Sequence, residues 1–262
     1  MIGSMYNLVR GPAILGSARQ PKRRKYMSAD LREKWAFITG ASRGIGRQLA
    51  LGLADQGCHL ILHSREKQHT ATLEKELSGR AGRVVSLAAE LSDQGAVDRL
   101  VDEVLALCGG PDIVYNNAAI MTPFRKDWLG TPADDYRRSF EVNVITPIHI
   151  TSRVLPGMRT RGWGRIVQVT SGIVDQPELM AYAASKAALD KFVRDTSPSL
   201  RGSGVLMNLL DPGWLRTDLG GPKAPNSVET VLPGALVPAL LDDDTQGKLF
   251  HALDYSRGPA QK

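Results

Sequence analysis

Short apolar segments recur along this chain and alternate with longer segments of mixed polarity. The apolar segments are four to seven residues long, which suits a buried strand and is too short for a helix. Strands that alternate with helices in this way indicate an α/β protein with one parallel, doubly wound sheet. The predicted strands are Trp35–Thr39, Cys58–His63, Arg83–Ala89, Asp112–Tyr115, Arg165–Val169, Val205–Leu210 and an edge strand at Gly247–His251.

The longer segments predict the helices between these strands. Three of them are Arg47–Gln56, Lys67–Leu77 and Gln94–Leu107. A later helix is expected to begin with Thr131 as its cap and Pro132 at its first position. This helix carries Asn143 and then Pro147, and a proline inside a helix removes a hydrogen bond and kinks it. Asn143 either holds a water or a backbone carbonyl there, or only satisfies the kink.

A glycine-rich turn follows the first strand and leads into the first helix. Gly40, Gly44 and Gly46 allow the backbone to turn sharply and to approach a ligand closely. The helix N-terminus behind them offers free N–H groups and a positive dipole end to a pyrophosphate. We therefore predict a dinucleotide site at this turn. The alternative is a turn whose glycines serve packing alone.

The end of the second predicted strand indicates which dinucleotide is bound. Many dinucleotide-binding proteins have an acidic residue there, which binds the ribose 2′-hydroxyl. This chain has Ser64 and Arg65 instead, and Arg43 lies within the glycine turn. Because arginine pairs with a phosphate and a carboxylate would repel it, we expect NADP(H) to be favoured over NAD(H). The alternative is an ordinary solvated arginine at a strand end.

An Ala-rich segment near residue 182 carries the candidate chemistry. Tyr182 and Lys186 are four residues apart, so they share one face of the predicted helix. A cation about 4 Å from a phenol contributes about 4 kcal/mol at an effective dielectric of about 20, which lowers the pKa from about 10 to about 7. Ser171 follows a predicted strand and its hydroxyl is expected to hold a carbonyl oxygen beside the phenol. The alternative is an ordinary surface pair.

The net charge of +6 arises in the first 26 residues, which contain six basic residues and no acidic one. Without these six, 27 basic residues balance 27 acidic ones. We expect residues 1–32 to be a basic, disordered extension without catalytic function, and a transit peptide or an upstream start site are the alternatives. Nucleic-acid binding through this extension has little further support. No apolar run is long enough to cross a bilayer, and the two cysteines have no metal-site spacing, so a reduced cytoplasmic compartment is expected.

The order of these motifs resembles the short-chain dehydrogenase/reductase family over about residues 33–220. The motifs are Thr39-Gly-x-x-x-Gly-x-Gly46, Asn116-Asn-Ala-Ala119, Asn143, Ser171, Tyr182-x-x-x-Lys186 and Pro212-Gly213. The resemblance implies a single Rossmann-like domain over residues 33–262, with a substrate lid at about 213–233. Two departures are Ala119, where glycine is usual, and the 11 residues between Ser171 and Tyr182, about two fewer than is common.

The same resemblance implies a role for each site residue. Tyr182 would be the general acid/base and would also contact the cofactor. Lys186 would lower the pKa of Tyr182 and bind the nicotinamide ribose. Ser171 would orient the carbonyl, and Asn143 would hold a water of the proton relay. The other cofactor-binding residues fall into four groups along the cofactor. They are Gly40, Ser42, Arg43, Gly44, Ile45 and Gly46 at the phosphates and adenosine; Glu90 and Leu91 at adenine; Asn117 and Ala118 at the nearby ribose; and Pro212, Gly213 and Thr217 at the nicotinamide.

We therefore expect an enzyme that interconverts a carbonyl and an alcohol by hydride transfer with NADP(H). The apolar residues of the lid, among them Trp214 and Leu219, favour an apolar ketone or aldehyde as substrate. The alternative is a dinucleotide-binding regulatory or scaffold protein on the same fold. We expect no metal, no nucleic acid and no membrane as partners, and a homodimer or homotetramer as the assembly.

Overall fold

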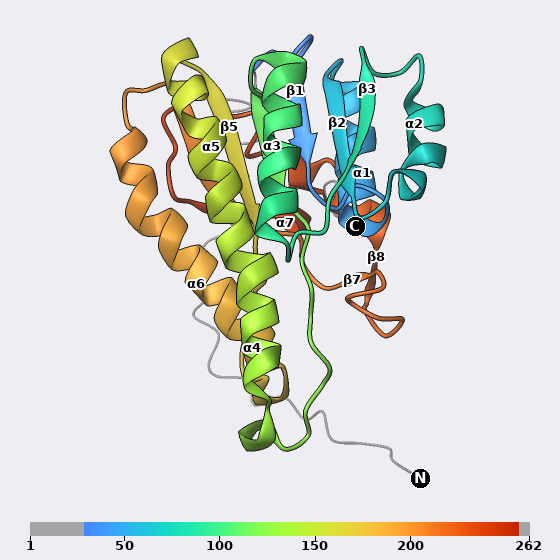
Figure 1. Cartoon of the computed structure of the whole chain (residues 1–262), viewed down its shortest axis with the longest axis vertical. Coiled ribbons are helices and arrows are strands. Elements are labelled where there is room, and N and C mark those ends of the chain that lie inside the picture. Colours follow the sequence, from blue (N-terminus) through green and yellow to red (C-terminus); the bar gives the residue numbers. More distant parts are fainter. Residues whose placement is uncertain (1–28, 257–262) are drawn as a thin grey trace, which may run out of the picture.

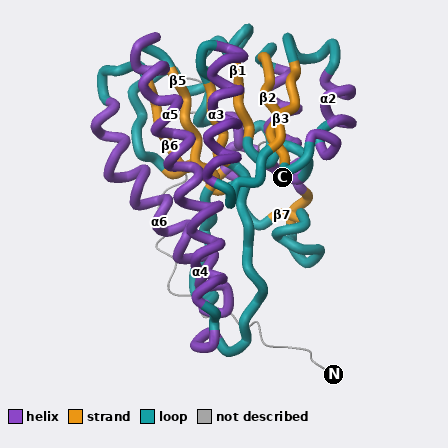
Figure 2. The backbone as a smooth tube through the Cα atoms, viewed as in Figure 1, coloured by secondary structure: helices purple, strands orange, loops and turns teal. Residues whose placement is uncertain are grey.

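The structure, a computed structural model, describes residues 29–256 (Figure 1). The expectation for the basic extension falls almost entirely on residues 1–28, which lie outside the described part. Within the described part, a seven-stranded parallel sheet runs in the order β3-β2-β1-β4-β5-β6-β9 (Figure 2). The strands are β1 Trp35–Ile38, β2 His59–Ser64, β3 Val84–Ala88, β4 Ile113–Asn116, β5 Gly164–Val169, β6 Val205–Asp211 and β9 Leu249–His251. The predicted α/β fold with a doubly wound parallel sheet is confirmed.

Helices cover both faces of this sheet and form two separate apolar layers. Side chains alternate along each strand, so Ile38 packs on one layer while its neighbour Phe37 packs on the other. The first layer contains α1 and α2, and the second contains α3, α5 and α6. The helices are α1 Gly44–Asp55, α2 Ala71–Leu77, α3 Gln94–Cys108, α4 Ala133–Phe140, α5 Thr146–Arg161, α6 Met180–Thr196 and α7 Ala252–Ser256.

Three helix predictions need correction at their starts. The segment Lys67–Leu77 is not one helix, because a 3-10 turn at Lys67–His69 ends at Thr70 before α2 begins. Thr131 is not the cap of α4, because Pro132 takes the extended cap position and the helix starts at Ala133. Helix α1 begins within the glycine turn, three residues earlier than predicted.

A π-helical turn, Glu141–Ile145, joins α4 to α5 and contains Asn143. Pro147 is in the first turn of α5, so the irregularity expected at this proline lies just before it as the π-helical turn. The wider helical repeat carries the chain past the proline without a regular α-helical hydrogen bond at that residue. The Asn143 side chain is thereby aimed inward, and it is fully buried.

The predicted lid segment is an ordered structure beyond the carboxyl ends of the strands. Its short strands β7 Leu215–Arg216 and β8 Asn226–Ser227 pair in parallel, and a 3-10 turn follows at Val228–Val231. Figures 1 and 2 show β7 and α4 beyond the same end of the sheet. Leu215 and Val231 are buried in the first apolar layer, so only part of the apolar lid residues can face a substrate.

Candidate active site

The glycine turn is shaped for an anion and also by its own packing. Gly40 and Gly44 have φ values of +67° and +55°, a region that favours glycine. A Cβ on Gly46 would lie 2.1 Å from the carbonyl oxygen of Gly40, so this glycine is required by the turn itself. The first turn of α1 has no acidic residue and no side-chain cap, which leaves its N–H groups suited to a pyrophosphate. Ser42 and Ile45, between these glycines, are half-buried.

The end of β4 is tied to this turn by side-chain hydrogen bonds. The Asn117 amide donates to the carbonyl oxygens of Thr39 at 2.9 Å and Gly40 at 3.2 Å. The backbone N–H of Ala118 donates to the Thr39 hydroxyl at 3.0 Å. The Asn117 side chain is thus engaged within the protein, and Ala118 lies against Gly40.

A residue absent from the predicted site, His63, connects the carboxyl ends of three strands. Its Nδ1 accepts a hydrogen bond from the Gly40 N–H at 3.2 Å, and its Nε2 lies 3.1 Å from the carbonyl oxygen of Ala89. Burial lowers the pKa of His63 to about 4, so the ring is neutral and Nε2 is the donor. In the sequence, only the position of His63 at the end of an apolar run could have indicated this role.

The residues expected to recognise a 2′-phosphate lie at the edge of the turn. Arg65 is exposed directly after β2, while Ser64 is buried and donates to the carbonyl oxygen of Glu66 at 2.7 Å. Arg43 forms an exposed ion pair with Asp218 of the lid at 3.0 Å. Arg65 is therefore the better candidate partner for a 2′-phosphate, because Arg43 already pairs with a carboxylate.

The residues expected beside adenine follow β3. Glu90 is exposed, and its carboxylate accepts hydrogen bonds from the N–H and hydroxyl of Ser92, both at 3.1 Å. Leu91 is buried, and its carbonyl oxygen accepts from the Thr146 hydroxyl at 2.7 Å. These bonds fix the turn after β3 beside the start of α5.

Tyr182 and Ser171 meet at the carboxyl end of β5. Tyr182 is 6% exposed, and burial raises its pKa above the usual value, while the neighbouring Ser171 hydroxyl opposes this effect. Lys186 is 3% exposed; its Nζ donates to the carbonyl oxygen of Val169 at 2.8 Å and lies 5.8 Å from the Tyr182 ring centre. Burial lowers the pKa of Lys186 to about 8. The expected lowering of the phenol pKa by Lys186 is not seen, because burial raises this pKa and the ammonium group is directed to the carbonyl oxygen of Val169.

Asn143, in the π-helical turn between α4 and α5, connects this turn to α6, the helix that carries Tyr182. Its amide donates to the carbonyl oxygen of Ile120 at 2.9 Å and to the Ser185 hydroxyl at 3.0 Å, and its oxygen accepts from the Ile120 N–H at 2.9 Å. Ser185 in turn donates to the carbonyl oxygen of Tyr182 at 2.7 Å. The backbone carbonyl that Asn143 engages is thus that of Ile120. Ser185, one residue before Lys186, was not predicted to take part.

The predicted nicotinamide end follows β6. Gly213 has φ of +82°, and its N–H donates to Asp211 Oδ1 at 2.9 Å directly after Pro212. The methyl group of Thr217 lies 3.4 Å from the place a Cβ on Gly44 would take. The predicted lid segment therefore reaches from the end of β6 across to the glycine turn.

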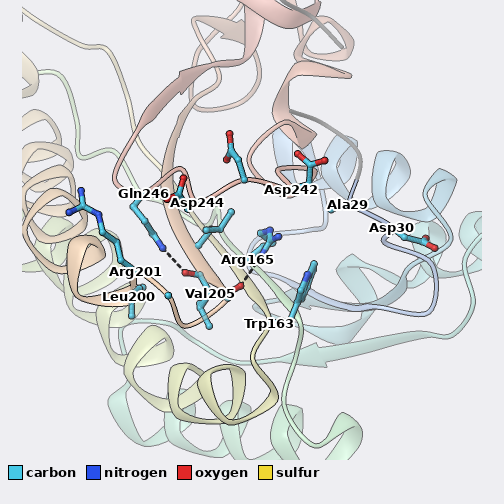
Figure 3. A pocket seen from close by; sticks show the side chains of 14 residues that line it. Ala29, Asp30, Trp163, Arg165, Leu200, Arg201, Val205, Asp242, Asp244 and Gln246 are labelled. Atoms are coloured by element: carbon cyan, nitrogen blue, oxygen red, sulfur yellow. Dashed lines mark hydrogen bonds between the residues drawn. The ribbon is translucent and has the colours of Figure 1, made fainter. Parts of the chain in front are cut away.

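A cavity of about 400 Å³ lies at the amino ends of β5 and β6, the end of the sheet opposite the predicted site (Figure 3). Arg165 in the wall of this cavity donates to the backbone carbonyl oxygens of Leu241 and Gly204, so its guanidinium group is engaged by the backbone.

In residues 29–256 no helix is long and apolar enough to span a membrane. The same residues contain no group of three or more side chains suited to a metal ion.

The fold and this site define a class of protein, and comparison with known proteins agrees. The short chain dehydrogenase family matches residues 34–227, so the chain belongs to the short-chain dehydrogenase/reductase family. Members of this family are oxidoreductases that bind a nicotinamide dinucleotide on a Rossmann fold and act on alcohol and carbonyl groups.

Two relatives and one solved structure illustrate the similarity over the aligned part of the chain. A short chain dehydrogenase of Pseudocercospora fijiensis is 34% identical over 73% of this chain and 63% of its own length. D-beta-hydroxybutyrate dehydrogenase of Cupriavidus necator is 31% identical over 72% of this chain and 73% of its own. The crystal structure of a 3-oxoacyl (acyl-carrier-protein) reductase from Agrobacterium tumefaciens with NADP bound has a TM-score of 0.76 at 26% identity, covering 84% of this chain and 93% of that one.

Proposed function

We propose that this chain reduces an apolar ketone or aldehyde with NADPH, with Tyr182 as the proton donor. The observation that carries the proposal is the buried phenol of Tyr182 on α6, which lies beside Ser171 after the carboxyl end of β5, the end of the sheet at which the glycine turn follows β1. When bound, the nicotinamide supplies a hydride to the carbonyl carbon. The carbonyl oxygen then takes the phenolic proton, and the product is an alcohol.

The ionisation of the two central side chains fits the direction of reduction. Because the pKa of Tyr182 is raised, the phenol keeps its proton at neutral pH and can donate it. Lys186, with a pKa of about 8, is a cation at neutral pH and would bind the nicotinamide ribose. Ser171 would hold the carbonyl oxygen beside the phenol, and Asn143 and Ser185 hold the helix that carries Tyr182.

Binding of NADP(H) in preference to NAD(H) is supported by charge at the end of β2. Arg65 is exposed there, and a 2′-phosphate is the feature that distinguishes the two cofactors. The NADP-bound reductase of Agrobacterium tumefaciens shows the same fold with this cofactor. The residues of the glycine turn would hold the phosphates of the cofactor.

Apolar surface near Ser171 and Gly213 supports an apolar substrate. Val174 is 73% exposed close to Ser171, and Trp214 is 57% exposed at the start of the lid, proposed to be residues 213–233. The test is NADPH oxidation by the purified chain with a panel of apolar and charged carbonyls, with the alcohol product identified by mass spectrometry. We expect turnover with apolar ketones or aldehydes, and a preference for charged carbonyls would contradict the proposed substrate class.

A further inference from the structure

An ion pair joins the predicted lid segment to the glycine turn. Arg43 Nη1 lies 3.0 Å from Asp218 Oδ2, and the two side chains are 68% and 72% exposed. Next to this pair, the Thr217 methyl group lies 3.4 Å from the place a Cβ on Gly44 would take. Two consecutive lid residues therefore meet two consecutive residues of the glycine turn, and one of these contacts joins opposite charges.

The lid segment holds Asp218 within a tight turn of its own. The N–H groups of Gly220 and Gly221 donate to the hydroxyl of Thr217 at 3.0 Å and to its carbonyl oxygen at 2.8 Å, respectively. The indole N–H of Trp214 donates to the carbonyl oxygen of Gly220 at 2.8 Å. These bonds close the turn around Asp218 without using its carboxylate, so the lid segment presents this negative charge to the glycine turn.

Arg43 lies at the edge of the proposed cofactor site that also carries Arg65. The Ala41 N–H donates to the carbonyl oxygen of His63 at 2.8 Å, so the glycine turn contacts the end of β2. Each arginine follows its end of this bond by two residues. Arg43 has an extended backbone before α1, and its side chain makes no capping bond there. Both arginines thus flank the strand end at which the proposed function places the 2′-phosphate.

Resting on the proposed function, we propose that Asp218 is a specificity-determining residue that competes with the 2′-phosphate of NADP(H) for Arg43. Carboxylates and phosphates are both partners of a guanidinium group. A phosphate at Arg43 would stand beside the Asp218 carboxylate, and like charges repel. NAD(H) carries a hydroxyl group in place of this phosphate and meets no such competition. Asp218 therefore weakens the binding of NADP(H) selectively and leaves Arg65 as the main partner of the phosphate.

The test is the dissociation constant, measured by titration calorimetry on the whole chain for NADPH and for NADH. Adenosine 2′,5′-bisphosphate and 5′-AMP repeat the comparison without the nicotinamide, so that the difference reports the 2′-phosphate alone. Asp218→Asn removes the charge and keeps the size of the side chain. We expect it to lower the Kd for NADPH and for the bisphosphate by about two- to fivefold, the range that an exposed ion pair allows. The Kd for NADH and for 5′-AMP should change little, because neither has this phosphate.

Asp195→Asn is the matched control, because this carboxylate also forms an exposed ion pair, with Lys191 on α6 and away from the glycine turn. It changes the net charge by the same amount and should leave all four Kd values unchanged. A second comparison uses Arg43→Gln. In that background Asp218→Asn should give no further gain for NADPH, since the contested partner is missing.

An unchanged or raised Kd for NADPH in Asp218→Asn overturns the inference, as does an equal fall for NADPH and NADH. A full gain from Asp218→Asn in the Arg43→Gln protein also overturns it, because the carboxylate would then repel the phosphate without Arg43. If the unchanged chain binds NADPH no better than NADH, the proposed cofactor preference fails instead, and the two failures are distinct.

Discussion

At the scale of single residues, the proposed site depends on the charges around the Tyr182 phenol and around the 2′-phosphate of the proposed cofactor. Tyr182 is almost fully buried, so small changes in the charges around it alter its protonation. Arg65 has the opposite setting, because it is exposed and can act only on a ligand group that comes to it. In the proposed function, Tyr182 supplies the proton and Arg65 selects the dinucleotide.

Arg65→Asp should raise the KM for NADPH by at least tenfold and leave the KM for NADH nearly unchanged. The substitution replaces a partner of the 2′-phosphate by a group that repels it. Steady-state kinetics with both cofactors measure the effect. Arg201→Asp is the control, because this exposed arginine lies at the opposite edge of the sheet beside the cavity. Equal changes for NADPH and NADH in Arg65→Asp would show that Arg65 does not read the phosphate.

At the scale of elements, side-chain hydrogen bonds within the protein join the ends of neighbouring strands. His63 joins the glycine turn to the end of β3, and Asn117 joins the same turn to the end of β4. These bonds are made to backbone atoms, so they fix the shape of the turn rather than the identity of a ligand. Substitutions here should therefore act on stability as well as on binding.

Gly46→Ala should destabilise the protein by about 1–3 kcal/mol, since its Cβ would overlap the Gly40 carbonyl. Chemical denaturation measures the change, and NADPH binding should weaken with it. Gly95→Ala in α3 is the matched control, because its Cβ would make only ordinary contacts and alanine favours a helix. A Gly46→Ala protein as stable as the control would contradict the packing role of this glycine.

His63 should make stability fall as the pH drops from about 6.5 toward 4. The pKa of His63 is about 4 in the folded protein and about 6.5 when unfolded, so the unfolded chain binds more protons in this window. The contribution amounts to about 3 kcal/mol at most, fully present above pH 6.5. Unfolding free energies at pH 7.5, 6 and 5 should show a steeper loss in the unchanged protein than in His63→Gln. Equal slopes would rule out this contribution.

At the scale of the whole molecule, the proposed site lies entirely within residues 29–256, while the excess positive charge lies in residues 1–26. Removal of residues 1–26 should therefore leave kcat and both KM values within about twofold, a change of less than about 0.5 kcal/mol. Kinetics of the shortened chain measure this, and a large loss of activity would give the extension a catalytic function.

We further expect a homodimer or homotetramer, which light scattering of the purified chain would reveal.

The sequence was sufficient to predict the fold and the order of the site motifs, because both depend on local patterns. Apolar runs of strand length and glycines at a strand–helix junction can be read without knowing what packs against them. The Arg43–Asp218 pair could not be predicted, since its members lie far apart in the sequence and meet only because the lid segment reaches the glycine turn. The raised pKa of Tyr182 was missed for a similar reason, because burial depends on the whole fold.

The central claim is that Tyr182 gives a proton to the carbonyl oxygen while the dinucleotide gives hydride. The most direct measurement is the single-turnover rate of NADPH oxidation by Tyr182→Phe with a carbonyl that the unchanged chain reduces. We predict a rate lower by about 10²–10⁴-fold, with the Kd for NADPH unchanged because the ring and its packing remain. A rate within a few fold of the unchanged protein would contradict the claim.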